Sequence, residues 1–237
     1  MMATMEPEAT ASREPEATAS TEPEATASTE PTATASTEPT AQDLFGALPE
    51  QDEQVTARLH ARLAAAAAAE GILDVAYRTV DTPLGTLLLA ATEQGLVRVA
   101  YPNQGHDAAL VQLAELVSPR ILNAPGRLDG VARQLDEYFA HRRRAFDVPV
   151  DLRLSRGFRH NVLTHLRQIP YGATESYAQV AAATGHPRAV RAAGTACATN
   201  PVPIVVPCHR VVRSDGSPGG YAGGPDAKRS LLTLEAA

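Results

Sequence analysis

The spacing of apolar and polar residues divides the chain into three stretches of different character. In residues 1–40 the large apolar side chains are those of Met1, Met2 and Met5, and they follow no regular interval. From residue 55 onward, a helical pattern is followed by period-two runs and then by further helical patterns. After residues 149–151 the patterns are mostly helical. Strands gathered in the middle of the chain, with helices around them, predict the α+β fold class.

The middle stretch is expected to begin with a helix and to continue as an antiparallel meander. Val55, Leu59 and Leu63 recur every four residues, and Gly71 follows the alanine run in which this pattern ends. The turn sequences Thr-Pro-Leu-Gly and Glu-Gln-Gly separate short runs rich in β-branched and apolar residues. We therefore expect a helix over 55–69, strands over 74–80, 86–91 and 95–101, and helices over 107–116 and 128–141.

The last stretch contains a pair of short helices joined by a glycine-containing turn, which is the pattern of a helix-turn-helix. Ser176 is the expected N-cap of the first of them, because Gln179 three residues later completes a capping box. That helix should stop at Gly185, and Pro187 suits the first position of the next. Pro201 disfavours helical geometry in the residue before it. The expected helices cover 157–169, 176–185 and 187 to about 199.

The second helix of this pair has one cationic face and one apolar face. Residues at helical spacing share a side, which places Arg188, Arg191, Ala192 and Thr195 on one face and Val190, Ala193, Gly194 and Cys197 on another. Small residues beside arginines suit a close approach to a nucleic-acid groove. Cys197 is expected to be a buried structural thiol.

The first forty residues repeat an eight-residue phrase that begins Glu-Pro-Glu-Ala-Thr-Ala-Ser. Such a tract buries too little apolar surface to offset its ordering entropy, so we expect disorder and a spacer role, with a docking segment as the alternative. Its eight glutamates and one arginine give it a charge of −7, whereas the whole chain carries −6. The remainder is therefore near neutral at +1, and a modest DNA-binding patch is compatible with the acidic total.

Composition excludes several classes of protein. Hydrophobic residues make up 44% of the 237 residues, but aromatic residues only 4%, so alanine supplies much of the core. No run approaches the roughly 20 apolar residues that span a bilayer, and the acidic N-terminus lacks the features of a signal peptide or a presequence. We expect a cytoplasmic protein in which the two cysteines, Cys197 and Cys208, are free thiols.

The most informative segment is Asn-Pro-Val-Pro-Ile-Val-Val-Pro-Cys-His-Arg-Val-Val over 200–212, followed by Gly-Tyr-Ala-Gly-Gly over 220–224. It resembles the active-site signature of the O6-alkylguanine-DNA alkyltransferases, also called methylated-DNA–protein-cysteine methyltransferases. The resemblance extends from about Gly157 to the C-terminus, and more weakly back to Asp74. It implies repair by direct reversal, in which an alkyl group moves irreversibly from O6-alkylguanine, and from O4-methylthymine, to Cys208.

The chemistry explains why a cysteine and a histidine lie together. Displacement at an alkyl carbon needs a thiolate, and a free cysteine titrates near pH 8.5, so a base must help to ionise Cys208. His209 is the candidate base. Neighbouring side chains on an extended chain point to opposite faces, so a water bridge or a sharp turn must connect the two. The resemblance adds Glu235 as the carboxylate that orients the imidazole, as in a catalytic triad.

The resemblance also assigns roles to residues around the cysteine. Asn200 matches the asparagine that braces the active-site loop, Tyr177 the tyrosine that contacts the base and crowds the phosphate, and Arg191 the arginine finger that replaces the extruded nucleotide. The remaining candidates are Tyr221, Ala222, Val211 and Lys228 for the substrate, where Ala222 replaces a common serine and offers its backbone N–H to the guanine O6, and Arg188, Ala192, Gly194 and Thr195 for DNA.

The implied architecture is a small N-terminal ribonuclease-H-like α/β domain joined to a C-terminal helical winged helix-turn-helix domain. We place the disordered tail at 1–40, a helical lead-in at 41–72, the N-terminal domain at 73–152 and the DNA-binding and alkyl-acceptor domain at 153–237. We expect a single-turnover monomer that binds double-stranded DNA containing alkylated guanine. It needs no cofactor or metal, and the sequence has no glycine-rich cofactor loop after a strand.

Three other functions remain to be weighed. A transcriptional regulator would use the helix-turn-helix but would leave Cys208 beside His209 without a purpose. A cysteine hydrolase would need a base that reaches the sulfur directly, and adjacency in sequence argues against that. A zinc site is disfavoured because Cys197, Cys208 and His209 lack close paired spacing.

Overall fold

The computed structural model describes residues 53–236. The predicted tail over 1–40 and the first part of the lead-in lie outside these residues. The elements, in chain order, are α2 (Glu53–Ala69), β1 (Val75–Val80), β2 (Leu87–Thr92), β3 (Gly95–Ala100), α3 (His106–Leu116), β4 (Ile121–Asn123), α4 (Asp129–Phe139), α5 (Gly157–Leu166), β5 (Glu175–Ser176), α6 (Tyr177–Ala183), α7 (Val190–Ala198), β6 (Val211–Val212) and α8 (Gly224–Ala236).

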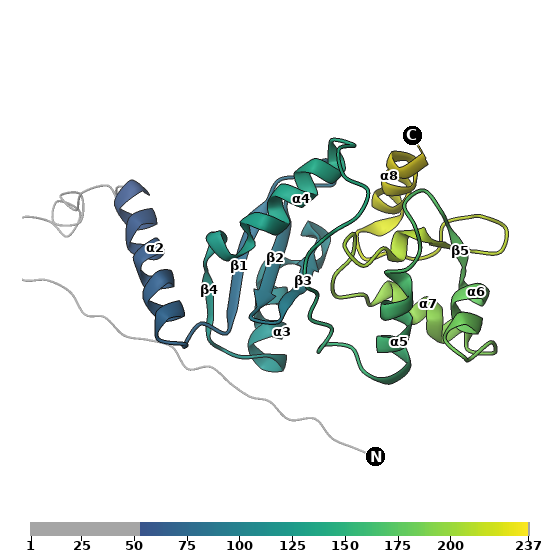
Figure 1. The fold of residues 1–237 in the computed structure, drawn as a ribbon, viewed down its shortest axis with the longest axis horizontal. Coiled ribbons are helices and arrows are strands. Elements are labelled where there is room, and N and C mark those ends of the chain that lie inside the picture. The colour runs from purple at the N-terminus through teal and green to yellow at the C-terminus, as the bar shows by residue number, and fades with distance from the viewer. Residues whose placement is uncertain (1–52, 237) are drawn as a thin grey trace, which may run out of the picture. The chain divides into compact units, whose positions relative to one another are not determined.

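The first sheet has the strand order β3-β2-β1-β4 (Figure 1). Strands β1, β2 and β3 pair antiparallel in succession, which confirms the predicted meander. The edge strand β4 runs parallel to β1 and was not predicted. It has only three residues, too few to show a period of two.

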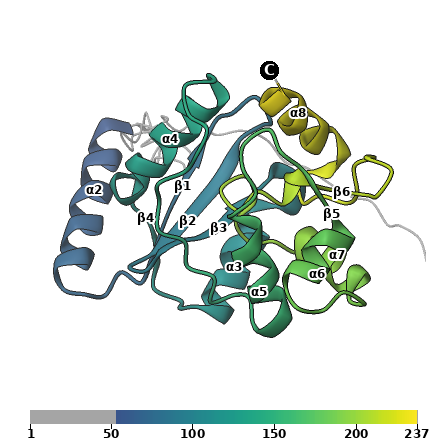
Figure 2. The same ribbon diagram turned by 45° about the vertical axis from the view of Figure 1, so that its right-hand side comes forward.

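Helices cover both faces of this sheet. Every residue of β2 is buried, because α4 packs on one face and α3 on the other. Leu87 and Leu89 belong to the same apolar cluster as Leu135 of α4, whereas Ala90 packs with Leu113 of α3. Burial on two faces makes the strand read as a continuous apolar run. Helix α2 lies beside β4, on the far side of the sheet from α5–α8 in both ribbon views (Figures 1 and 2).

The C-terminal part confirms the predicted helix pair and corrects the start of its second helix. Ser176 and Gln179 form the capping box at the start of α6. Helix α7 begins at Val190 instead of Pro187, because residues 187 and 188 form a turn that closes with a bond from the amide of Ala189 to the carbonyl of His186. Arg188 therefore precedes the helix, and Val190 is 37% exposed instead of packed inside.

The two parts share one apolar core, which brings segments distant in the sequence together around Cys208. Its buried residues include Leu96 and Val99 of the sheet and Leu163, Val180 and Val206 of the C-terminal part. These features confirm the α+β fold class. No helix within residues 53–236 is long and apolar enough to cross a membrane.

Candidate active site

Cys208 opens a single 3-10 turn, residues 208–210, between an irregular loop and strand β6. The amide of Arg210 donates to the carbonyl of Pro207, which bends the backbone sharply at this point. Cys208 and His209 are both fully buried. This turn is one of the two arrangements that the sequence required for neighbouring side chains to act together.

Asn200 holds the loop that precedes the cysteine. Its side-chain nitrogen donates to the carbonyl of Val206 at 2.8 Å and to Sγ of Cys208 at 3.1 Å. Its side-chain oxygen accepts from the amide of Val202 at 3.0 Å. Both ends of the amide are occupied, so the donor that faces the sulfur has a fixed direction. In the same loop Ile204 has a φ of +73°, a strained conformation for a β-branched residue.

The sulfur is a thiol in the resting protein at neutral pH. Complete burial raises the pKa of Cys208 to about 11, although the hydrogen bond from Asn200 and the charge of Lys228 act in the opposite direction. Cys197 of α7 is also buried and free, as predicted, and burial raises its pKa further still. A base is therefore needed if Cys208 is to react as a thiolate.

His209 has the tautomer that suits such a base. Its Nε2 lies 2.9 Å from Oε1 of Glu235, and the pKa of Glu235 is held well below its ordinary value by its hydrogen bonds with His209 and Arg210, despite burial. The carboxylate is an acceptor only, so Nε2 carries the proton. Burial lowers the pKa of His209. Nδ1 is therefore a bare lone pair, buried and without a hydrogen-bond partner among the described residues.

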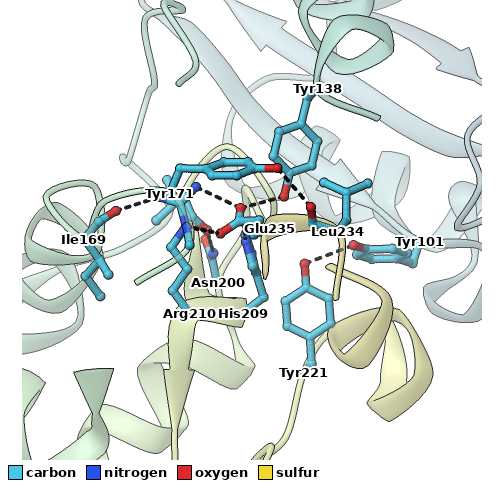
Figure 3. Close-up of polar contacts among 12 residues, drawn as sticks. Tyr101, Tyr138, Ile169, Tyr171, Asn200, His209, Arg210, Tyr221, Leu234 and Glu235 are labelled. Atoms are coloured by element: carbon cyan, nitrogen blue, oxygen red, sulfur yellow. Dashed lines mark hydrogen bonds and ion pairs between the residues drawn. The ribbon is translucent and has the colours of Figure 1, made fainter. Parts of the chain in front are cut away.

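Glu235 accepts hydrogen bonds from several parts of the chain, as Figure 3 shows. It is 5% exposed, near the end of α8, and is not a solvated tail residue. Arg210 binds both carboxylate oxygens, at 2.8 Å from Nε and 2.9 Å from Nη2. Tyr138 donates to Oε1 at 2.7 Å, and the amide of Gly172 to Oε2 at 3.3 Å. No sequence pattern had predicted a role for Arg210 or Tyr138.

Tyr221 and Ala222 lie in a loop that is held in place by residues 73–152, called the sheet half below. The hydroxyls of Tyr221 and Tyr101 are 3.0 Å apart, and Asn103 donates to the carbonyl of Ala222 at 3.2 Å. Gly223 packs against the ring of Tyr101 so closely that a Cβ there would lie 2.7 Å from it. The ring of Tyr221 also meets His209 edge-on, with centroids 6.4 Å apart. This loop is thereby fixed on one side of the buried histidine.

Tyr177 and Lys228 lie together on another side. Lys228 is completely buried, which rules out a surface charge, and burial lowers its pKa. Its Nζ donates to the carbonyl of Val211 at 2.5 Å and to the hydroxyl of Tyr177 at 3.4 Å. Burial raises the pKa of Tyr177 to about 12, so its hydroxyl remains a donor at neutral pH. A Cβ on Gly219 would overlap that hydroxyl.

The predicted DNA-binding residues lie mostly at the surface, outside this buried cluster. Arg188, Arg191, Ala192 and Thr195 are exposed, whereas Gly194 is half-buried against the ring of Tyr177. Neither the guanidinium of Arg188 nor that of Arg191 forms an ion pair or a hydrogen bond within residues 53–236. The same described residues contain no group of three His, Cys, Asp or Glu side chains that could hold a metal ion.

Comparison with known proteins finds similarity along both halves. The model of the ribonuclease-like domain of 6-O-methylguanine DNA methyltransferase matches residues 75–152, and the model of its DNA-binding domain matches residues 157–237. The methylated-DNA–protein-cysteine methyltransferase of Mycolicibacterium paratuberculosis is 40% identical over 161 residues, which cover 68% of this chain and 92% of that protein. The constitutive enzyme of the same name from Bacillus subtilis is 38% identical and covers 67% and 94%.

A solved structure gives the same result. The crystal structure of Mycobacterium tuberculosis OGT in complex with DNA is 39% identical, with a TM-score of 0.60, and the match covers 68% of this chain and 92% of that one.

Proposed function

Because the chain belongs to the 6-O-methylguanine DNA methyltransferase family, we propose that it repairs DNA by moving the alkyl group of O6-alkylguanine onto Sγ of Cys208. It is a methylated-DNA–protein-cysteine methyltransferase, and its partner is double-stranded DNA. The observation that carries the assignment of Cys208 is its burial beside a fixed Asn200 donor, with a neutral imidazole in the next residue.

The transfer is a displacement at the alkyl carbon. Sγ forms a bond to that carbon while the carbon–O6 bond breaks, and its electron pair stays with the guanine. The thiol proton passes to Nδ1 of His209, through a bridging water or after a small rotation, because no direct hydrogen bond joins the two side chains in the described chain. The guanine gains one proton overall. Since the product is a stable thioether, each molecule acts once.

The alkylated base cannot reach Sγ of Cys208 while it is stacked inside the duplex, so it must be extruded. We assign α7 to the groove, Arg191 to the space of the extruded nucleotide, and Arg188, Ala192, Gly194 and Thr195 to the surrounding contacts. Tyr177, Tyr221, Ala222, Val211 and Lys228 are assigned to the base and its alkyl group. The exposed side of α7 and the DNA complex of the M. tuberculosis relative support this assignment.

The proposed division of the chain places the acceptor domain at 153–237 and the sheet domain at 73–152. We also propose a cytoplasmic location, because a reducing compartment keeps Cys208 as the thiol that the transfer requires. Cell fractionation with an antibody against the protein tests this location.

The test of function is to incubate the protein with duplex DNA that carries labelled O6-methylguanine. We expect one methyl mass on the peptide that contains Cys208, at most one label per molecule, and none in Cys208→Ala. Cys197→Ala is the matched control and should keep the label, because its thiol is equally buried but lies outside the polar cluster. Release of free product over many turnovers would instead indicate a hydrolase.

A further inference from the structure

One side chain of the sheet half touches the catalytic carboxylate. Tyr138 belongs to α4, ninety-seven positions before Glu235, and is completely buried. Its hydroxyl donates to Oε1 of Glu235 at 2.7 Å, and Figure 3 shows the ring directed toward the carboxylate from the opposite side to Arg210 and His209. Burial and the charge of Glu235 raise the pKa of Tyr138. The hydroxyl is therefore a permanent donor.

The oxygen that Tyr138 binds is the one that supports His209. Oε1 accepts from the Tyr138 hydroxyl, from Nε2 of His209 and from Nη2 of Arg210, at 2.7, 2.9 and 2.9 Å. A hydrogen bond to a carboxylate stabilises its charged form and makes that oxygen less basic. The three donors on this oxygen therefore compete: a stronger bond from Tyr138 leaves less negative charge for the imidazole.

We propose that Tyr138 is a positioning residue for the transfer, which aims Oε1 at His209 and keeps the imidazole neutral, so that Nδ1 is free to accept the thiol proton. The proposal rests on the proposed function of Cys208. If so, the ribonuclease-like half helps to set the basicity of His209. The contact between Tyr138 and Glu235 could not be predicted from any local sequence pattern.

Removing this donor should change the pH dependence in one direction. With Oε1 less satisfied, the carboxylate holds the Nε2 proton more strongly and stabilises the imidazolium, so the pKa of His209 rises. When the pH is lowered, His209 is then protonated, and the transfer lost, at a higher pH than in the parent. The midpoint of the acid side of the rate profile therefore moves to higher pH. The other titratable and charged groups around the His209–Glu235 pair keep their places: Arg210, Lys228, Cys208, Tyr171, Tyr221, Tyr101 and Arg144.

Tyr138→Phe keeps the ring and removes the hydroxyl. We measure single-turnover transfer from methylated duplex across mildly acidic to mildly alkaline pH, and expect the acid-side midpoint to move up by about half a pH unit or more, the worth of one hydrogen bond. Tyr171→Phe is the matched control. It removes a 3.0 Å hydrogen bond to the carbonyl of Leu234, next to Glu235, without freeing a carboxylate oxygen. Its midpoint should stay that of the parent.

A merely structural role for Tyr138 would lower the rate at every pH and leave the midpoint unmoved, and that result would overturn the proposal. The same is true if Tyr171→Phe shifts the midpoint equally. Should Tyr138→Phe fail to fold, 3-fluorotyrosine at position 138 keeps the shape and strengthens the donor, so the midpoint must move down instead. Loss of transfer in the parent protein would reject the proposed function; a parent that transfers, with unmoved midpoints in the variants, rejects only the role of Tyr138.

Discussion

The buried cluster around Glu235 and the exposed segment 188–191, where α7 begins, both contain arginines, but the environments of these arginines are opposite. Arg210 is 7% exposed and makes three hydrogen bonds, two of them to a carboxylate. Arg188 and Arg191 are exposed, and their guanidinium groups have no ion pair or hydrogen bond within residues 53–236. One arginine is part of the fold, whereas the other two are available to a partner.

This contrast separates the cost of folding from the cost of binding. A buried charge must be paired in the folded protein, because water is not there to solvate it. An exposed arginine stays solvated until it meets phosphates or bases, and its contribution appears only when DNA binds. The chemical groups are thus arranged in advance, and the contacts with DNA form on association. Substitutions at the two places should therefore affect different measurements.

The largest effect is expected from Arg210→Met, which leaves the buried carboxylate of Glu235 without its counter-charge. Breaking a buried ion pair from one side costs about 3–5 kcal/mol, so the free energy of unfolding, measured by urea denaturation, should fall by that order. Arg213→Met is the control, because the side chain of Arg213 is exposed and its one hydrogen bond within residues 53–236 is a 3.4 Å contact with the hydroxyl of Ser217. A similar loss in both variants would show that the buried Arg210 contributes no more to stability than an exposed arginine.

Arg191→Ala should leave stability almost unchanged and reduce transfer from duplex DNA by about tenfold, the usual effect of losing one contact in a groove. Transfer from the free alkylguanine base should stay the same, because no nucleotide has to be replaced. Arg188→Ala is the matched variant: it should weaken DNA affinity and lower the salt slope by about one. Equal losses of Arg191→Ala on duplex and on free base would reject the finger assignment.

The sequence predicted most of the fold because its signals are local. The meander, the capping box of Ser176 and the helix pair follow from residues at most a few positions apart. The start of α7 was predicted three residues too early, because Pro187 suits either a turn or a first helical position. Helix α8, Gly224–Ala236, was missed because two of its four buried residues, Lys228 and Glu235, are charged, which interrupts the apolar stripe of the buried face.

The candidate site was predicted only where the resemblance named a residue. Cys208, His209, Asn200 and Glu235 were named in this way, and the structure brings them together in one buried cluster. Contacts made across the fold leave no local pattern, and Tyr138 is the clearest case, separated from Glu235 by ninety-seven positions.

The smallest effect is expected where the sheet half supports the loop of Tyr221 and Ala222. Tyr101→Phe removes the 3.0 Å contact between two buried hydroxyls and leaves that of Tyr221 without a partner among the described residues. An unpaired buried hydroxyl costs about 1–2 kcal/mol, which loosens this loop without unfolding the protein. We expect methyl transfer to slow by about threefold or less, while bulkier benzyl groups lose less, so the benzyl-to-methyl ratio of rates rises.

Asn103→Ala is the matched variant for this loop, because it removes a 3.2 Å bond to the carbonyl of Ala222 from the exposed side. That carbonyl remains open to water, so the rate ratio should change less than in Tyr101→Phe. Single-turnover rates with both alkyl groups measure the difference. If the two variants shift the ratio equally, burial of the tyrosine pair has no special effect. The contacts that hold this loop then behave like exposed contacts, as at the surface of α7, and not like the buried contacts around Glu235.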